Sequence, residues 1–394
     1  MPTYAQNYLA ALHSYQQEML QRVAELVNID SGTGQIEGVN RIAKRLVEWL
    51  DEIGFSVELH EAPRFGNNVV AKRRGRAENG RPRLLIVGHI DTVYEAGSAA
   101  SHPFCEEGEL AYGPGVIDMK SGVVMGIYAL RALLEAGFEQ FGEICVVFNN
   151  DEEVGSPGSS SLLADLGRQA DIGLVLEPTR AAEIVTNARK GADRYVLEIS
   201  GIPAHSGAEP FKGRSAVLEL AHKILAVHAL HSLFPGTTFN ITRLTSSETL
   251  NIVPDYARCT ISVRAHSDEM LNAAAAALEQ IATSVSVPDT RATLKRTRGR
   301  IPYRATPEIT RLVGVATEEA QALGIALVAE SKGGVSDANL LMSIGLPTLD
   351  SLGPVGGSMH DLNREYLRPA SLVQRGAMLA GVIQHLCLLE STGE

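Results

Sequence analysis

Between residues 83 and 178, apolar runs typical of buried strands alternate with helical patterns, and this alternation limits the possible folds more than any other feature. The strand-like runs are RLLIVGHID, EICVVFNN and DIGLVLEP, and the helical pattern DMKSGVVMGIYALRALLEAG precedes the second of them. A further helix is expected after Pro157. Because parallel strands are joined by crossover helices, the alternation predicts an α/β domain with a mixed, largely parallel sheet covered by helices.

Two helices are expected ahead of this region, over residues 8–28 and 36–53. The second helical pattern has apolar residues at i, i+3 and i+4 spacing, and it stops at Gly54. The strand-like runs FSVELH and NNVVAKR follow it.

The pattern changes near Arg189. From there to about Arg298 the predicted order is strand, strand, helix, strand, strand, helix, strand, which is typical of a small α+β sandwich. Helical patterns return in TPEITRLVGVATEEAQALG and ASLVQRGAMLAGVIQHL. We therefore expect an inserted domain over residues 189–298, within a discontinuous α/β domain formed by residues 1–188 and 299–394.

Composition and charge disfavour several classes of protein. The chain has 394 residues and a formal net charge of -11, which argues against nucleic acid and anionic membranes as partners. No apolar run reaches the ~20 residues of a membrane span, and the N-terminus has no signal-peptide pattern. The cysteines are far apart and form no C-x-x-C pair, as expected of reduced thiols. These features predict a cytoplasmic protein, with a periplasmic protein whose signal has been trimmed as the alternative.

Acidic and histidine side chains stand where the strands of the predicted sheet end. His89 and Asp91 close the first strand-like run. Glu152 and Glu153 follow the second run, and Glu177 follows the third. Ligands of open α/β sheets bind outside the carboxyl ends of the strands, so these side chains are predicted to share one site.

Two further candidates come from loops. Asp118 ends the loop AYGPGVID at the start of a helical pattern, and His360 lies in GGSMHDLN after the strand-like run PTLDSL. Histidine and carboxylate are ligands that zinc accepts. The candidate ligands are therefore His89, Asp118, Glu153, Glu177 and His360. Two cations with three protein ligands each need one ligand that bridges, and Asp118, from a separate loop, is the natural candidate.

The spacing within each pair suggests how the work is divided. Alternate side chains of a strand share a face, so Asp91 can lie behind His89 and hold the imidazole in one tautomer. Adjacent glutamates in an extended chain point apart, so Glu153 can bind a cation while Glu152 acts as general base on a water molecule. Taken alone, an H-x-D motif more often makes a local hydrogen bond, and a D-E-E triplet more often forms a solvated turn. The apolar strand before the triplet, with glycines after it, favours a functional site.

Nearly the whole sequence resembles the zinc-dependent metallopeptidases and deacylases, a family that includes glutamate carboxypeptidase, succinyl-diaminopimelate desuccinylase, acetylornithine deacetylase and the aminoacylases. The matching segments, in order, are GHIDTV, AYGPGVIDMKSG, FNNDEEVGSPGS, LEPT, GIPAHSGAEP, NIVPDYARCTISVR, GGVSDA and the late His360. The segments NIDSGTGQIEGVN, HIDTVY and TRGR bring the chain closest to the glutamate carboxypeptidase branch. Met119 departs from that branch, which often has an acidic residue after the bridging aspartate.

The resemblance implies roles that agree with those argued from the residues. It implies two zinc ions per subunit, with cobalt or manganese as substitutes, held by His89, Asp118, Glu153, Glu177 and His360. Glu152 matches the general base of the family, and Asp91 matches the aspartate behind the ligating histidine. A cis peptide bond between Asp118 and Met119 is also implied.

The inserted domain resembles the dimerisation lid of the family, so a homodimer is expected. His205 matches a histidine that reaches into the active site of the partner subunit to stabilise the oxyanion, and Asn251 matches a companion substrate contact. Arg264 and Arg300 match positions that bind a free carboxylate of the substrate, a task for which the paired N–H groups of guanidinium are well shaped. The loop that wraps the terminal group of the substrate matches Gly333, Gly334 and Ser336. Without the resemblance, these positions read equally well as turn residues and solvated arginines.

The expected activity is hydrolysis of an amide bond next to a free carboxylate in a small peptide or amide substrate. Release of C-terminal glutamate from folate-like, peptidyl or N-acyl substrates is the leading hypothesis. An N-acyl amino acid deacylase of the aminoacylase or acetylornithine deacetylase type, and a dipeptidase, are alternatives that no single residue decides. A catalytically silent binding protein is a third hypothesis, which the presence of Glu152 and of every candidate ligand disfavours.

Overall fold

The computed structural model describes residues 2–77 and 82–389, and its chain forms two compact units. The first unit comprises Met1–Asn187, Ala305–Ser331 and Ser336–Glu394, and the second comprises Ala188–Arg304 and Lys332–Val335. The second unit thus spans the segment expected as an insertion and also gathers four residues that lie much later in the sequence.

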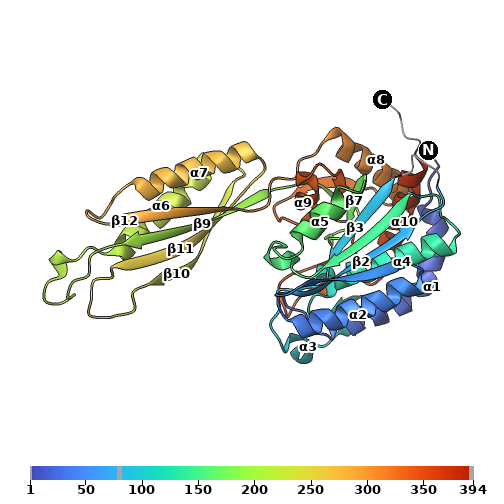
Figure 1. Ribbon diagram of the computed structural model, residues 1–394, viewed down its shortest axis with the longest axis horizontal. Coiled ribbons are helices and arrows are strands. Elements are labelled where there is room, and N and C mark those ends of the chain that lie inside the picture. The colour runs from blue at the N-terminus through green and yellow to red at the C-terminus, as the bar shows by residue number, and fades with distance from the viewer. Residues whose placement is uncertain (1, 78–81, 390–394) are drawn as a thin grey trace. The chain divides into compact units, whose positions relative to one another are not determined.

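The first unit is built on a six-stranded sheet in the order β1-β2-β6-β3-β7-β14 (Figure 1). Its strands are β1 Ser56–Ala62, β2 Gly66–Arg74, β3 Arg83–His89, β6 Glu143–Asn149, β7 Ile172–Val175 and β14 Thr348–Leu349. β3 runs parallel to β6 and β7, and β14 runs parallel to β7. β1 and β2 are antiparallel to their neighbours, so the predicted mixed, largely parallel sheet is confirmed.

Helices surround this sheet because their apolar residues repeat with helical spacing. The longer ones are α1 Ala5–Val27, α2 Ile36–Glu52, α4 Ser121–Glu135, α8 Pro307–Ala322 and α10 Ala370–Leu388, and the shorter ones are α3 Ser98–Ser101, α5 Ser160–Gly167 and α9 Asp337–Ser343. α1, α4 and α10 pack against one another, and α2 packs against β2. α4 and α10 are buried along most of their length, as their nearly continuous apolar sequences require. Throughout the described ranges, we find no helix with the length and apolarity needed to cross a membrane.

The start of α4 differs from the sequence prediction. The helical pattern was expected to begin at Asp118, whereas α4 begins at Ser121. A π-helical turn, η1 Val116–Lys120, precedes it, and the backbone at Asp118 and Met119 is not helical. The peptide bond between these two residues is cis, as the resemblance implied.

Smaller elements complete the first unit and hold the loop of His360. A four-stranded sheet has the order β15-β16-β5-β4. Its strands are β4 Cys105–Glu107, β5 Leu110–Tyr112, β15 Gly356–Gly357 and β16 Tyr366–Leu367. His360 lies in the connection from β15 to β16. Elsewhere, β8 Ile184–Arg189 pairs with β13 Val328–Lys332.

The second unit is a four-stranded antiparallel sheet with helices on one face (Figure 1). The order of the strands is β10-β11-β9-β12. The elements are β9 Gly191–Ser200, α6 Ala216–Leu233, β10 Thr238–Ser246, β11 Tyr256–Ala265, α7 Asp268–Thr283 and β12 Arg291–Arg298. Alternate residues of β9 and β11, such as Leu197 and Ile261, form an apolar core with α6 and α7. This unit therefore has a hydrophobic core of its own, as the predicted α+β sandwich requires.

Candidate metal centre

The candidate ligands of the first unit gather at the carboxyl ends of its central parallel strands. His89 is the last residue of β3, and its register partner Asn149 is the last residue of β6. Glu153 follows β6 in a single 3₁₀ turn, η2 Glu152–Val154. Glu177 follows β7 by two residues. Because these strands are parallel neighbours, their ends deliver the three side chains to one edge of the sheet.

Asp118 lies at the middle of the cluster and faces two histidines with different oxygen atoms. Its Oδ1 is 3.2 Å from Nε2 of His89, and its Oδ2 is 3.3 Å from Nε2 of His360. Glu177 Oε1 lies 3.9 Å from Nε2 of His89 on the first side. Glu153 Oε2 lies 3.4 Å from Nε2 of His360 on the second side. The cluster therefore divides into two halves that share one carboxylate, which is the arrangement a bridging ligand needs.

Glu153 supplies independent evidence that the donors fit a cation. Its side chain is largely buried, and among the described residues no donor reaches its Oε1. A buried carboxylate oxygen without a hydrogen bond is costly unless an ion satisfies it. Two groups of residues each bring their ligand atoms within 4.8 Å of one another. The first group is His89, Asp118 and Glu153, and the second is His89, Glu152 and Glu177.

The electrostatics of the cluster favour positive charge between the carboxylates. Burial lowers the pKa of His89, but hydrogen bonds with Asp118 and Asp91 outweigh it and leave the pKa well above its usual value. Hydrogen bonds with Asp118 and Glu153 raise the pKa of His360 to about 10. Burial raises the pKa of Asp118, yet its two histidine partners hold that pKa below its usual range. Protons and divalent cations would thus compete for the same imidazole nitrogens.

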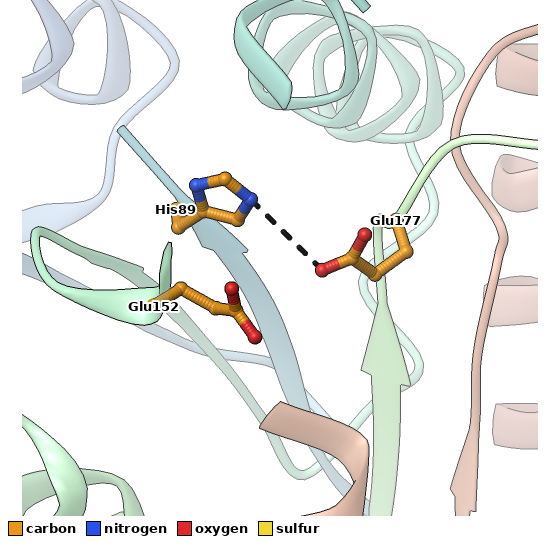
Figure 2. A group of neighbouring side chains, drawn as sticks. All are labelled: His89, Glu152 and Glu177. Carbon is orange, nitrogen blue, oxygen red and sulfur yellow. Dashed lines mark ion pairs between the residues drawn. The ribbon is translucent and has the colours of Figure 1, made fainter. Parts of the chain in front are cut away.

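Glu152 lies beside the cluster, and its carboxylate projects toward the space between His89 and Glu177 (Figure 2). Figure 2 also marks the ion pair between Nε2 of His89 and Oε1 of Glu177. Glu152 and Glu153 begin the same 3₁₀ turn, in which Glu152 groups with His89 and Glu177, and Glu153 groups with His89 and Asp118. The sequence analysis expected the two glutamates to point apart in an extended chain, whereas they lie in one 3₁₀ turn.

Asp91 holds both the histidine and the glutamate pair. Nδ1 of His89 lies 3.0 Å from the backbone carbonyl of Asp91 and 3.4 Å from its Oδ1. The backbone N–H groups of Glu152 and Glu153 donate to Oδ1 and Oδ2 of Asp91 at 3.1 and 3.2 Å. Thr33 Oγ1 donates to Oδ2 at 2.7 Å. The aspartate was predicted behind the histidine alone, whereas the structure also places it beneath the turn that carries the two glutamates.

A buried polar network supports the same turn from the side of α9. Asn149 Nδ2 and Ser156 Oγ donate to the carboxylate of Asp337 at 2.7 and 2.6 Å. Asp151 accepts hydrogen bonds from the backbone of Gly158 and from Ser159. All these polar side chains are buried, so the network fixes the turn in one conformation.

His205 and Asn251 belong to the second unit, where their backbones are neighbours. The N–H of Ser206 donates to the carbonyl of Asn251 at 2.9 Å. Nδ1 of His205 accepts the N–H groups of Gly207 and Ala208 at 3.2 and 3.1 Å. A neutral imidazole that accepts at Nδ1 carries its proton on Nε2, so the exposed His205 presents a hydrogen-bond donor.

Four other predicted substrate residues lie near one end of β9 and β11 in the second unit. Nη1 of Arg264 donates to the carbonyl of Gly333 at 3.2 Å, and Nη1 of Arg189 donates to the carbonyl of Gly334 at 3.1 Å. The carbonyl of Arg300 accepts the N–H of the β9 residue that pairs with Arg264. The glycine loop and the backbones of both arginines are thus held at the same end of the sheet.

Ser336 belongs to the first unit and is fully buried. Its side chain caps α9: Oγ accepts the N–H of Ala338 at 3.2 Å and donates to Oδ2 of Asp350 at 2.7 Å. These two bonds use the hydroxyl hydrogen and one of its two lone pairs, so one acceptor lone pair remains.

Three residues near the metal ligands were missed by reasoning from the sequence: Thr33, Tyr94 and Glu365. Thr33 bonds to Asp91, and the carboxylate of Glu365 accepts the hydroxyl of Tyr94 and backbone N–H groups of the Asp118 loop. DSGTG and DTVY belong to segments that resemble the family, but apart from that resemblance nothing in them or in NREY marks these three residues as functional. Their partners lie far away in sequence, and only the fold brings them together.

The site and the fold together define a class of protein. Histidines and carboxylates converge at the carboxyl edge of a parallel sheet, a central carboxylate faces two histidines, and a further glutamate lies alongside. This arrangement is suited to a metal-dependent hydrolase that activates water.

The chain belongs to peptidase family M20/M25/M40, whose sequence profile matches residues 85–385. It is 33% identical over 375 residues to carboxypeptidase G2 from Pseudomonas sp. strain RS-16, which covers 94% of this chain and 90% of the relative. It is 30% identical over 360 residues to acetylornithine deacetylase from Myxococcus xanthus, which covers 86% of this chain and 90% of the relative. The fold is shared with a tripeptidase from Staphylococcus aureus, with a TM-score of 0.81, 23% identity, and coverage of 95% and 99% of the two chains. The chain is therefore a metallopeptidase or amidohydrolase of this family, as the sequence predicted.

Proposed function

We propose that this protein is a two-zinc carboxypeptidase that releases C-terminal glutamate from folate-like, peptidyl or N-acyl substrates. The observation that carries the two-metal part is the position of Asp118, whose two oxygens face His89 and His360. The similarity to carboxypeptidase G2 along 94% of the chain supports the carboxypeptidase part.

In this proposal each half of the cluster holds one ion. His89 and Glu177 would hold the first ion and Glu153 and His360 the second, with Asp118 shared between them. Two zinc ions, or cobalt or manganese in their place, would supply a Lewis acid for the substrate carbonyl and lower the pKa of a water molecule.

Glu152 is the proposed general base. Its carboxylate takes a proton from the attacking water and later gives it to the leaving amine. Asp91 orients this chemistry, because it accepts hydrogen bonds from the backbone of Glu152 and contacts the ring of His89.

The second unit is proposed to bind the substrate and complete the oxyanion site. The Nε2–H of His205, from the partner subunit of a homodimer, would donate to the oxyanion, with Asn251 as a companion contact. Arg264 and Arg300 would bind the free carboxylate next to the scissile bond. The loop around the terminal group of the substrate would consist of Gly333, Gly334 and Ser336.

Basic side chains near Arg264 support an acidic substrate. Lys190 lies two residues before Ala192, the residue that pairs with Arg264, and His266 lies two residues after Arg264. Lys190 and His266 lie just outside the ends of β9 and β11, and the charge of Lys190 acts on His266. Burial and the positive charge of Arg264 lower the pKa of Lys190. A second carboxylate on the released amino acid, as in glutamate, would relieve this repulsion between like charges.

The surface of the second unit supports a homodimer. β10 is an edge strand, and the solvent side of α6 exposes large apolar side chains, including Leu218, Leu225 and Leu233. Leu225 and Leu233 are 68% and 71% exposed. A second copy could add its own edge strand and cover these side chains, since exposed strand edges and apolar patches favour association.

An N-acyl amino acid deacylase or a dipeptidase is the alternative function, and the similarity to acetylornithine deacetylase supports the first of these. Both alternatives use the same proposed chemistry and differ in the substrate. A catalytically silent binding protein remains the least favoured hypothesis, because Glu152 and all five candidate ligands lie together.

A substrate panel tests the proposal. The zinc-loaded protein would be given N-acyl amino acids and dipeptides that differ only in the released residue: glutamate, aspartate, alanine, phenylalanine or ornithine. Preferential release of glutamate is expected. Preferential release of another residue would favour the deacylase or dipeptidase alternative, and no release by zinc-loaded protein would contradict the enzymatic proposal for this panel.

A further inference from the structure

Glu365 is a buried carboxylate that accepts four hydrogen bonds beside the metal centre. Its Oε1 accepts the backbone N–H groups of Ile117 at 2.9 Å and Asp118 at 3.2 Å. Its Oε2 accepts the N–H of Gly115 at 3.2 Å and the hydroxyl of Tyr94. The residue is 1% exposed, so water contributes little to these interactions.

These hydrogen bonds connect three segments that carry candidate ligands. Gly115, Ile117 and Asp118 belong to the loop of the bridging aspartate. Tyr94 lies five residues after His89, and Glu365 lies five residues after His360. The backbone N–H of Glu365 also donates to the carbonyl of Asp361 at 2.8 Å, next to His360.

The loop of Asp118 has two internal backbone hydrogen bonds, from Val116 N–H to Gly113 and from Lys120 N–H to Gly115, and Glu365 adds a restraint on the N–H groups between them. Gly113 and Gly115 adopt positive φ angles of 140° and 70°, a region in which glycine is freely accommodated. Asp118 itself has no helical backbone geometry to fix it. The two oxygens of this side chain can accept several hydrogen bonds, so Glu365 alone can hold the backbone N–H groups of Gly115, Ile117 and Asp118 in place.

We propose that Glu365 is a positioning residue that fixes the bridging carboxylate of Asp118 between the two histidines and thereby sets the affinity for metal. Groups that orient ligands in this way typically change metal affinity 10–100-fold when they are mutated. This inference rests on the proposed metal centre but is independent of the substrate.

The test is zinc affinity of the metal-free protein, measured by competition with a chromogenic chelator. Glu365→Gln keeps the volume of the side chain, but its amide N–H₂ would face N–H or O–H donors where a carboxylate oxygen now accepts. We expect the dissociation constant of one of the two ions to be at least tenfold larger than in the wild type. Cobalt titration gives a second readout, because the visible absorption of the ion reports its ligand geometry.

Glu319→Gln is the matched control. Glu319 is a fully buried carboxylate of the same unit, and it accepts the N–H groups of Tyr4 and Ala5 and pairs with His385. Both substitutions should lower the melting temperature. Glu319→Gln should nevertheless leave zinc affinity within about twofold of the wild type, because none of the residues bonded to Glu319 is a candidate metal ligand.

If folded Glu365→Gln binds zinc with wild-type affinity, the inference is overturned and Glu365 has a structural role only. If that variant does not fold, Tyr94→Phe decides, since it removes one donor and keeps the carboxylate. A two- to fivefold loss of affinity is expected for Tyr94→Phe, and unchanged affinity would overturn the inference. Failure of the wild-type protein to bind two zinc ions would instead contradict the proposed metal centre.

Discussion

Single residues in this site are positioned mainly by hydrogen bonds to the backbone. Asp91 accepts the N–H groups of Glu152 and Glu153, so one buried carboxylate fixes two neighbouring acidic residues. In the proposed function, the mutual repulsion of the two glutamate carboxylates is offset by the cations they would face. The turn therefore allows two glutamates of identical chemistry to take different roles, because one meets His360 and the other lies toward His89 and Glu177.

Glu152→Gln tests the proposed general base. The amide cannot accept a proton, so we expect kcat to fall about 10²–10⁴-fold while two zinc ions still bind. Stopped-time assays of amino acid release and metal analysis of the purified variant measure the two quantities. Glu153→Gln is the comparison, and it should weaken zinc binding. Retention of wild-type kcat by Glu152→Gln would contradict the assignment.

The raised pKa of His360 predicts how metal affinity depends on pH. Asp118 and Glu153 raise this pKa to about 10 in the metal-free protein, so the ring carries a proton at neutral pH. Zinc must displace that proton, and its affinity should therefore increase with pH from about 6.5 toward 10, by about tenfold per pH unit for each proton released. Zinc titrations at several pH values measure the slope.

His360→Asn is the control for this slope, because it removes one titrating ligand. The variant should bind the second zinc ion weakly and show a shallower dependence on pH. An affinity that does not change between pH 6.5 and 9 in the wild type would contradict the prediction.

At the level of elements, strands set the positions of the ligands and loops set their directions. β3, β6 and β7 end at one edge of the sheet, so their following residues meet without any special local sequence. The loop before α4 behaves differently, because a non-helical segment with a cis peptide bond carries Asp118. The apolar periodicity of α4 continues into this segment, and for that reason the sequence predicted the helix three residues too early.

The exposed side of α6 provides a test of the proposed homodimer. Leu225→Glu places a charge on the apolar solvent side of the helix without disturbing the core of the second unit, because Leu225 is 68% exposed. We expect the variant to be a monomer with unchanged circular dichroism, since a buried unpaired charge opposes association. Light scattering or analytical ultracentrifugation measures the mass.

Ala276→Glu is the matched control for the dimer, because Ala276 is exposed on α7. That variant should stay dimeric. A wild-type monomer, or a dimer that persists in Leu225→Glu, would argue against association through α6.

At the level of the whole molecule, the chain combines a unit with a parallel sheet and a unit with an antiparallel sheet. The first unit holds every proposed metal ligand, and the second holds His205, Asn251 and both proposed substrate arginines. In the proposed function the first unit binds the metal ions and the second supplies most of the substrate contacts, so the activity needs both units.

Complementation between two inactive variants tests whether His205 acts on the partner subunit. Glu152→Gln lacks the base and His205→Ala lacks the oxyanion donor, so each homodimer should be nearly inactive. Mixed dimers would contain one site with both groups. After mixing and exchange of equal amounts, we expect roughly a quarter of wild-type activity. No recovery in mixtures that contain mixed dimers would contradict action across subunits.

The sequence by itself determined the elements and the chemistry of the candidate site. Apolar alternation and helical spacing are local properties, so they predicted the parallel strands, the main helices and the α+β character of the second unit. The residues His89, Glu153 and Glu177 could be chosen because the end of a strand is visible in the sequence. The family could be recognised because short motifs stand in a fixed order along the chain.

Only the tertiary structure decided how these residues meet. Contacts between segments that are distant in sequence build the site. They are the contacts of the two Asp118 oxygens with His89 and His360, the hydrogen bonds of Asp91 beneath the glutamates, and the four hydrogen bonds of Glu365. Such contacts arise from backbone groups in loops, where no periodic pattern marks them. Local sequence can specify that a carboxylate or a histidine is present, but the packing of separate segments determines which atom of each side chain faces which partner.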